Sequence, residues 1–305
     1  MDGILIIDKP EGITSHDVVA RVRRILKTKK VGHTGTLDPF ATGVMTVLVG
    51  RATRLAQFID KDEKRYVAVM RFGFDTDTGD LTGERLTDAG DTSPRNAVLK
   101  DIEMLKPQFI GQIEQIPPMY SAKKIDGKKL YELAREGKSV ERKPASVFIS
   151  GIEIVGHTNL TVNGKQVLDT LTIDVTCGAG TYIRTLAVDM AHRAGSAAHL
   201  TELRRTRSGR FGIDESITLE ALAELDDRSA VLRDMSEAVA HLDLFELRDD
   251  RVARTLNGMS TRVYGFESEL YDGQQFRMTA PDGRLIAVGI YRKSENSIFP
   301  TVVLG

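Results

Sequence analysis

The stretch from residue 32 to residue 49 constrains the fold more than any other part of the chain. Its glycines at positions 32, 35 and 43 permit backbone angles that other residues avoid. Pro39 fixes its own φ, lacks an amide donor, and biases Asp38 toward an extended backbone. The apolar residues 44–49 that follow would anchor this tight loop in a core. Ordinary turns share this pattern, but here it holds one carboxylate on a stiff backbone between glycines that let another molecule approach.

The composition indicates a globular protein rather than a disordered, secreted or membrane-spanning one. The chain has 305 residues, of which 41% are hydrophobic, and this length favours about two domains. Its single cysteine, Cys177, excludes an intramolecular disulfide and a thiolate-cluster metal site, and fits a reducing compartment. Asp8 and Lys9 come too early for a signal peptide, and no apolar run approaches the ~20 residues of a membrane span. We therefore expect a cytoplasmic protein.

The charges are balanced in number but uneven in position. The chain has 42 basic and 43 acidic residues and a net charge of −1, which does not by itself indicate a nucleic-acid binder. Residues 21–30 nevertheless hold six basic residues and no acid, and acidic residues concentrate between positions 214 and 250. Two further basic clusters are formed by Lys123, Lys124, Lys128 and Lys129, and by Arg204, Arg205, Arg207 and Arg210. Each cluster alone fits a solvated surface, but together they predict a positive face for RNA.

Four blocks of sequence, in a fixed order, suggest what the chain does. They are residues 32–43 (GHTGTLDPFATG), 117–137 (PPMYSAKKIDGKKLYELAREG), 177–186 (CGAGTYIRTL) and 199–209 (HLTELRRTRSG). Their combination resembles the bacterial tRNA pseudouridine synthase B family over nearly all of residues 3–212. The resemblance implies an enzyme that isomerises uridine 55 in the T-loop of tRNA. It also implies a monomer that takes the tRNA T-arm as its partner and needs no metal, nucleotide or other cofactor.

The resemblance assigns roles to five residues. Asp38 corresponds to the catalytic aspartate and Arg184 to the arginine that pairs with it. A guanidinium is a permanent charge with a forked donor set, so it suits a carboxylate and would keep it ionised. Tyr66 corresponds to the active-site tyrosine, whose ring can stack on a base and whose hydroxyl can exchange hydrogen bonds or accept a proton. Tyr182 and Leu203 correspond to residues that shape the base pocket.

Three further residues have weaker claims to contact the substrate. His33 is expected to fill the space that a flipped base leaves, although a loop histidine bonded to backbone is an alternative. Lys9, in the Asp-Lys-Pro element that borders the family's active site, is expected either to contact a phosphate or to be solvated. Tyr120 could stack on RNA or simply pack in the fold, and the sequence favours neither.

Two stretches resemble ligand-binding motifs, but the spacing of their residues does not match those motifs. Residues 75–80 (DTDTGD) suggest a calcium loop, but Gly79 and Leu86 stand where such a loop needs oxygen ligands, so we expect an exposed turn. Gly137-Lys138 suggests a phosphate-binding loop, but Glu132 occupies the position of its first glycine. We therefore expect neither a metal nor a nucleotide site.

The expected fold is α+β: a mixed, largely antiparallel central sheet with flanking helices, plus a small C-terminal β-rich domain. Periodicity predicts strands at 3–7, 64–73, 147–154 and 168–175, and helices at 15–26, 51–59, 94–105 and 130–136, one ending at 192, and helical spacing within 219–240. Thr14 and Asp17 have the spacing of a capping box, and Asp126-Gly127 and Asn163-Gly164 are typical of turns between strands. Residues 1–244 would form the catalytic domain. From about residue 245, short β-like segments with glycine turns match the family's RNA-binding PUA-type domain in composition and position, so 245–305 would form a PUA-like domain.

The reaction implied by the resemblance detaches uracil at N1 and rejoins it through C5. A carboxylate could act as a nucleophile on the ribose or base, or as a base on a glycal-type path, and the sequence leaves both open. Either path requires base flipping, which costs a few kcal/mol. Two alternatives remain: a tRNA-binding or folding module, and the same isomerisation of another RNA uridine.

Overall fold

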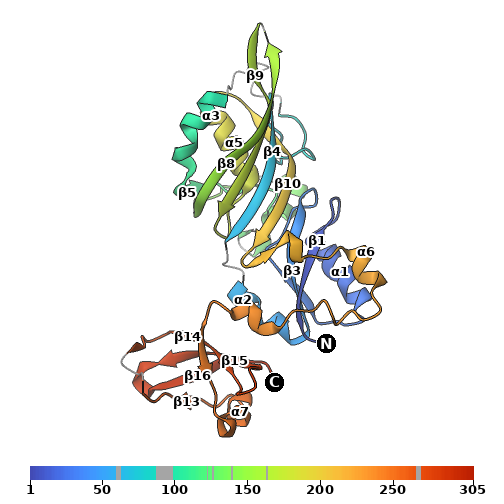
Figure 1. Cartoon of the computed structure of the whole chain (residues 1–305). Helices are drawn as coiled ribbons and strands as arrows, with labels where there is room; N and C mark the ends of the chain where they lie inside the picture. Colours follow the sequence, from blue (N-terminus) through green and yellow to red (C-terminus); the bar gives the residue numbers. More distant parts are fainter. Residues whose placement is uncertain are drawn as a thin grey trace.

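The structure is a computed structural model that describes residues 1–59, 63–86, 99–121, 123–125, 127–138, 140–162, 164–265 and 269–305. The molecule is elongated, with a large sheet and its helices at one end and a smaller sheet at the other (Figure 1). The expected turn residues Asp126 and Asn163, and the first part of the helix expected at 94–105, lie outside the described residues.

The large sheet has nine strands in the order β1-β3-β10-β4-β9-β8-β5, with β2 also paired to β3 and β11 to β10. Its strands are β1 (Gly3–Lys9), β2 (Val31–Thr34), β3 (Thr42–Val49), β4 (Lys64–Phe72), β5 (Gly111–Gln115), β8 (Ala145–Val162), β9 (Lys165–Cys177), β10 (Ala198–Ser208) and β11 (Phe211–Gly212). Within this sheet β3 and β10 run parallel, and the other pairs are antiparallel. The predicted mixed, largely antiparallel sheet is confirmed.

Helices cover this sheet at two places (Figure 1). Helix α1 (Ser15–Ile25) packs with α6 (Leu219–Glu224) on the β1 end. It begins with the expected capping box, in which Thr14 and Asp17 bond to each other's backbone amides. Helices α3 (Leu99–Leu105) and α5 (Ile183–Arg193) pack against β4, β8, β9 and β10 in a second core.

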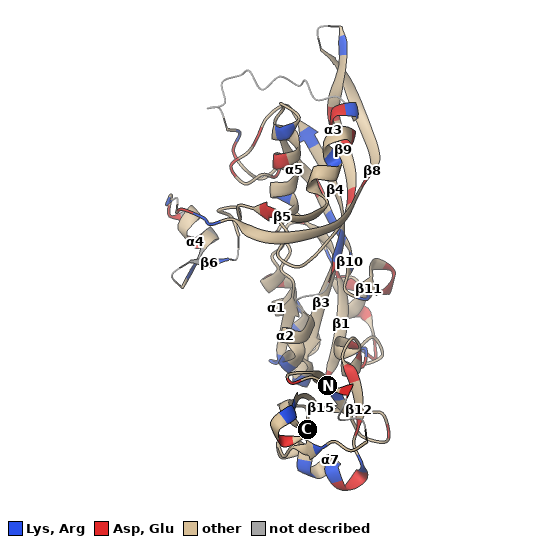
Figure 2. Ribbon diagram, turned by 90° about the vertical axis from the view of Figure 1, so that its left-hand side faces the viewer, with Lys and Arg blue, Asp and Glu red and all other residues tan. Residues whose placement is uncertain are grey.

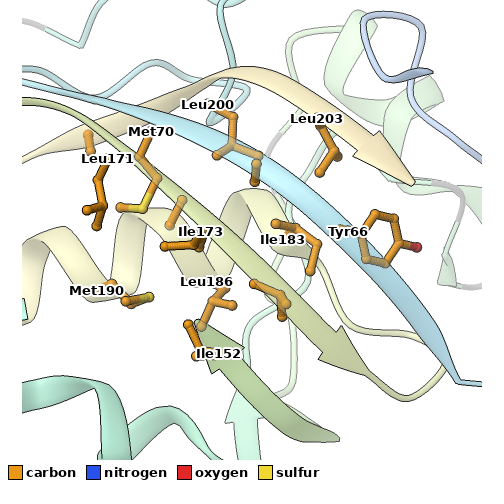
Figure 3. Packing of buried hydrophobic residues seen from close by; sticks show 14 of the residues in the cluster. Tyr66, Met70, Ile152, Leu171, Ile173, Ile183, Leu186, Met190, Leu200 and Leu203 are labelled. Atoms are coloured by element: carbon orange, nitrogen blue, oxygen red, sulfur yellow. The ribbon is translucent and has the colours of Figure 1, made fainter. Parts of the chain in front are cut away.

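That second core ends at the cavity described below. Figure 3 shows Met70, Leu171 and Met190 at one end of the labelled side chains and Tyr66 and Leu203 at the other. Burial of large apolar side chains is worth about 1.5–3 kcal/mol each, so this row fixes β4, β10 and α5 relative to one another. The elements that carry the candidate site therefore share one rigid support.

A small arm leaves the large sheet between β5 and β8 and projects to one side (Figure 2). It contains β6 (Lys124–Ile125) paired with β7 (Lys128–Lys129), followed by α4 (Leu130–Arg135). Arg142, after the arm, donates from Nη1 to the Pro117 carbonyl before it, at 3.1 Å. The two ends of the arm are thus tied together at its base.

The second sheet has five strands in the order β12-β14-β15-β16-β13 and its own core. Its elements are β12 (Asp243–Glu246), α7 (Asp249–Leu256), β13 (Thr261–Arg262), β14 (Gln275–Thr279), β15 (Leu285–Arg292) and β16 (Ser297–Val303). A shared apolar cluster joins it to the large sheet, with Leu285, Val302 and Leu304 packed beside Ile4, Leu48 and Leu55. Arg51 also donates from Nη1 to the Leu304 carbonyl at 2.7 Å. The division into domains at 244/245 stays a prediction.

Short helical segments complete the fold. The segments are η1 (Gly50–Leu55), α2 (Ala56–Ile59), η2 (Lys106–Phe109), η3 (Ile213–Glu215), η4 (Met235–Val239) and η6 (Lys293–Glu295). The helical structure expected within 219–240 is confirmed only at α6 and η4, because the chain between them turns back and Arg233 exchanges backbone hydrogen bonds with Ile4 of β1. Helix α7 was not expected in the β-rich end. No helix in the described ranges is long and apolar enough to cross a membrane.

Candidate active site

A cavity of about 260 Å³ lies where the Asp38 loop meets β4, β10 and the start of α5. Five of the residues singled out in the sequence line it: Asp38, Tyr66, Tyr182, Arg184 and Leu203. They come from positions up to 165 residues apart, and the parallel contact between β3 and β10 brings the Asp38 loop beside Leu203. The cavity is smaller than the pockets that hold drug-sized ligands, which fits a single flat ring.

Asp38 and Arg184 form an ion pair in this cavity, with Arg184 Nε 2.9 Å from Asp38 Oδ2. Asp38 stands between β2 and β3, where Ala41 N–H donates to its carbonyl and closes the turn that Pro39 stiffens. Arg184 lies in the first turn of α5, and its side chain is 4% exposed, whereas that of Asp38 is 33% exposed. The Asp38 carboxylate is therefore accessible from the cavity, and the buried Arg184 guanidinium holds it in place.

A second carboxylate, Asp80, shares the same guanidinium. Arg184 Nη1 lies 3.4 Å from Asp80 Oδ2, and Asp80 is buried at 3% exposure. Asp80 accepts hydrogen bonds from the Thr78 hydroxyl at 2.9 Å and from the Thr82 amide and hydroxyl at 2.9 and 2.6 Å. The expectation of an exposed turn at residues 75–80 is therefore wrong, because Thr76, Gly79 and Asp80 are buried and Asp77 alone in this stretch is exposed. Sequence reasoning missed Asp80, because the threonines on either side of it indicate only a local turn.

Backbone carbonyls complete the coordination of Arg184. Its Nη2 donates to the Tyr120 carbonyl at 2.7 Å, and its Nη1 donates to the Thr78 carbonyl. A guanidinium carries five N–H donors in a fixed plane, so carboxylates and carbonyls on several sides hold it in one orientation. Arg184 is thus placed by three separate segments of the chain.

The electrostatics of the site centre on Asp38. Burial raises the pKa of the Asp38 carboxyl, the adjacent Arg184 lowers it, and the second carboxylate at Asp80 raises it again. The charge of Asp80 therefore takes part, with Arg184, in setting the protonation of Asp38. A raised pKa makes this carboxylate a stronger base than a solvated aspartate.

Tyr66 forms the other wall of the cavity and is 8% exposed. Tyr66 of β4 lies directly opposite Arg205 of β10 in the sheet. Burial raises the pKa of the Tyr66 phenol, and the Arg205 guanidinium opposes this shift. Arg205 itself is fully buried, donating from Nε to the Val44 carbonyl at 2.6 Å and from Nη2 to the Gly35 carbonyl at 2.9 Å. It therefore fixes both ends of the Asp38 loop.

The arginine cluster at 204–210, for which the sequence predicted an RNA-facing surface, is buried at Arg205 and partly exposed but ion-paired at its other three residues. Arg205 is buried, and Arg204 pairs with Asp8 at 2.8 Å. Arg207 pairs with Glu63 at 2.8 Å and Arg210 with Glu237 at 3.7 Å. Each cation of this cluster has a partner within the protein, which lowers its contribution to a positive surface.

Lys9 was expected to contact a phosphate or to be solvated, and both expectations are wrong. Its side chain is fully buried, and Nζ donates to the carbonyls of Pro10, Pro39 and Ala41 at 2.9, 3.1 and 2.6 Å. Burial lowers the pKa of Lys9 to about 8, although the charge of Asp38 opposes the shift. Lys9 supports the Asp38 loop from beneath and does not face RNA.

Tyr120 and His33 lie outside the small cavity. A larger groove of about 780 Å³ adjoins it, shares Asp38 and Arg184, and is lined by Tyr120, whose hydroxyl is 3.3 Å from Asp77 Oδ2. His33, on β2, makes an edge contact with the ring of His16, which lines this groove; the centroids are 5.7 Å apart. His33 is not among the described lining residues of either space. The roles of both residues stay predictions.

Comparisons with known proteins agree with this geometry. Residues 23–183 match the model of the TruB family pseudouridylate synthase N-terminal domain, and residues 184–240 that of the tRNA pseudouridylate synthase B C-terminal domain. A Geobacter sulfurreducens protein named tRNA pseudouridine synthase B is 44% identical over 85% of this chain and 82% of its own length. A Bacillus pumilus protein of the same name is 39% identical over 100% and 98%.

Solved structures resemble the whole chain. The structure of a Cbf5-Nop10-Gar1 complex covers 99% of this chain and 85% of its own with a TM-score of 0.71 and 26% identity. An H/ACA RNP bound to a substrate RNA containing 2'-deoxyuridine aligns with a TM-score of 0.72 at 24% identity, which shows the fold alone. The fold and the matches define an enzyme of the pseudouridine synthase class. Within that class, the chain belongs to the TruB family of pseudouridylate synthases.

Proposed function

We propose that this enzyme converts uridine 55 in the T-loop of tRNA to pseudouridine, with Asp38 as the essential carboxylate. The observation that carries the proposal is the Asp38–Arg184 ion pair, 2.9 Å between Nε and Oδ2, at the wall of a ring-sized cavity. The names of the curated relatives support tRNA as the substrate. The position of the uridine comes from the resemblance of the four sequence blocks.

The lining of the cavity supports a flipped pyrimidine as its occupant. Tyr66 and Leu203 offer an aromatic and an aliphatic surface, and a flipped base is commonly held between such side chains. Asp38 faces the same space, so the ribose carbon or the base itself would lie within its reach. The larger adjoining groove offers a path for the flanking nucleotides. Tyr182 would border the ring, and Tyr120 and His33 would lie toward the rest of the loop.

The reaction is balanced without a co-reactant. The bond from C1' to N1 breaks, the uracil turns, a bond from C1' to C5 forms, and the proton of C5 is exchanged for one on N1. Asp38 would act either as a nucleophile, forming a covalent intermediate, or as a base that removes a ribose proton. Arg184 would keep Asp38 anionic in both cases, and Asp80 would hold Arg184 in place. The buried Tyr66 phenol, with its raised pKa, would stay neutral and offer a hydrogen-bonding group to the base.

The remaining parts of the chain have proposed supporting roles. The arm at 123–135, which carries lysines, would contact the T-arm, and the second sheet within 245–305 would act as a PUA-like RNA-binding domain beside a catalytic domain at 1–244. We propose a monomeric, cytoplasmic enzyme. The buried thiol of Cys177, 1% exposed, supports a chain that works without disulfides.

The test is to incubate the protein with an unmodified tRNA transcript and map pseudouridine by position. We expect modification at position 55 alone, and none when that uridine is replaced by cytidine. Pseudouridine at a different position would move the assignment to another RNA site, and none at any position would refute the reaction. If the Asp38→Ala variant still refolds tRNA, the protein has an additional RNA-folding activity, because RNA folding does not need the Asp38 carboxylate.

A further inference from the structure

Gln115, at the end of β5, makes a two-point contact with the backbone at the start of α5. Its side-chain Oε1 accepts from the Tyr182 amide at 3.0 Å, and its Nε2 donates to the Tyr182 carbonyl at 3.2 Å. Gln115 is 1% exposed, and both bonds are part-buried. We infer that Gln115 is a positioning residue, which holds the backbone of Tyr182 at the start of α5 so that Arg184 meets Asp38; this rests on the function proposed above.

The start of α5 needs such an external anchor. Tyr182 is the residue before the helix, and its own side chain makes no capping bond. The first amides of a helix lack intrahelical partners, so an acceptor from outside the helix stabilises its start. The loop that leads into the helix contains Gly178 and Gly180, and Gly180 has a φ of +87°, so the chain on this side is permissive. The Gln115 amide therefore supplies the fixed point.

Arg184 lies two residues beyond this fixed point, so its position follows that of the first turn. The segment from Gln115 to Tyr120 crosses the start of α5 and touches it twice, because the Tyr120 carbonyl accepts from Arg184 Nη2 at 2.7 Å. The same segment leads directly into the arm, whose base is closed by Arg142 on Pro117. Gln115 thus anchors the ion pair to the edge of the sheet, while the root of the arm is held separately by Arg142.

Geometry at a reacting centre is sensitive to small displacements, and a 1 Å misplacement can cost about 100-fold in rate. Gln115→Leu removes both hydrogen bonds and leaves the carboxylate, the guanidinium and the RNA-binding surfaces unchanged. We expect its single-turnover rate of pseudouridine formation to fall by about 10- to 100-fold, while the Kd for tRNA stays within about twofold. Hydrogen exchange at the Tyr182 amide should become faster. Gln112→Leu is the matched control, because Gln112 lies on the same strand, is exposed and bonds only to Ser146 Oγ among the described contacts.

Gln115→Glu gives a second, reversible test. An ionised glutamate can accept from the Tyr182 amide but cannot donate to the Tyr182 carbonyl, whereas a protonated one restores both bonds. The ratio of the variant's rate to the wild-type rate should therefore rise as the pH falls, and the titration of Asp38 cancels in this ratio. This measurement stands even if Gln115→Leu fails to fold.

A wild-type rate in Gln115→Leu would overturn the inference, as would a rate ratio for Gln115→Glu that does not change with pH. A loss of tRNA affinity equal to the loss of rate would also overturn it, because it would indicate general damage. If the wild-type protein makes no pseudouridine in any tRNA, the proposed function fails, and hydrogen exchange at Tyr182 still decides whether Gln115 holds this peptide.

Discussion

Two buried arginines border the same cavity and differ in whether carboxylates are among their partners. Arg184 donates to the carbonyls of Thr78 and Tyr120 and also faces the carboxylates of Asp38 and Asp80 at 2.9 and 3.4 Å. Arg205 bonds instead to the carbonyls of Val44 and Gly35 at 2.6 and 2.9 Å. Carbonyl dipoles satisfy the donors of a guanidinium without titrating, so Arg205 gives a fixed loop. Carboxylates change charge with pH, so the surroundings of Arg184 can take part in chemistry. The comparison separates a structural cation from a functional one by its partners.

The largest expected effect is on the carboxylate itself. Asp38→Asn should lower the single-turnover rate by about 10³-fold or more, because the amide can act neither as a nucleophile nor as a base. Burial raises the pKa of Asp38, so removing the charge should leave the thermal midpoint unchanged or raise it by a few degrees. Rate and thermal unfolding measured on the same preparation check both parts. A rate close to that of the wild type would refute the assignment of Asp38.

The second largest effect is expected at Arg184, the arginine that pairs with carboxylates. Arg184→Gln should lower the rate by about 100-fold at neutral pH and move the acidic limb of the pH–rate profile to higher pH. The sign follows from the pKa of Asp38, which Arg184 lowers; without the guanidinium that pKa rises, and the anion appears only at higher pH. Profiles of kcat/KM against pH for both proteins are the measurement. An unshifted limb would show that Arg184 does not control the charge of Asp38.

For Arg205, the arginine that bonds to carbonyls, we expect a substitution to lower the stability of the fold. Arg205→Met removes the donors to the buried Val44 carbonyl and the part-buried Gly35 carbonyl, and each unsatisfied buried group costs about 1–3 kcal/mol, so the free energy of unfolding should fall by about 3–4 kcal/mol. Urea denaturation measures this loss. Arg204→Met is a matched control, since Arg204 is 43% exposed and pairs with Asp8 at the surface. Equal losses in the two variants would break the contrast between buried and surface cations.

The smallest effect concerns Lys9, which also bonds only to carbonyls among its described hydrogen bonds. Its pKa is lowered to about 8 in the folded protein, so the unfolded chain binds more protons between pH 8 and its ordinary value of 10.5. Stability should therefore rise with pH across this window, by up to about 3 kcal/mol. The difference in unfolding free energy between wild type and Lys9→Met isolates the effect, since other groups titrate in both. A difference that is flat between pH 7.5 and 10 would contradict the burial of a charged amine.

The sequence predicted the parts of the fold that depend on local pattern. The strand at 64–73 and the helix at 15–26 follow from periodicity and capping, and β4 and α1 begin and end within a residue or so of these bounds. The helical structure expected within 219–240 is limited to α6 and η4, because the acidic and apolar residues alternate there without specifying where the chain must turn back to β1. Local pattern cannot encode such a long-range contact.

The sequence predicted only some of the residues and contacts of the candidate site. The stiff loop at Asp38 was evident from its glycines and proline, but the pairing with Arg184 came from resemblance to a family and not from spacing. Asp80 was missed because its partner lies more than a hundred positions away, and the burial of Lys9 was missed because its carbonyl partners are invisible in sequence. Side chains that bond to backbone carbonyls leave no pattern of residue types.

The joint between the two sheets has a consequence for how the chain is made. Arg51 in η1 and the Leu304 carbonyl that it contacts are separated by 253 positions, and Leu285, Val302 and Leu304 complete the apolar cluster around Ile4 and Leu55. During synthesis the apolar surface around Ile4 and Leu55 therefore stays exposed to solvent until β15 and β16 have been synthesised. A nascent or truncated product lacking those strands would be expected to recruit chaperones or aggregate through this patch, even with the cavity at Asp38 already assembled.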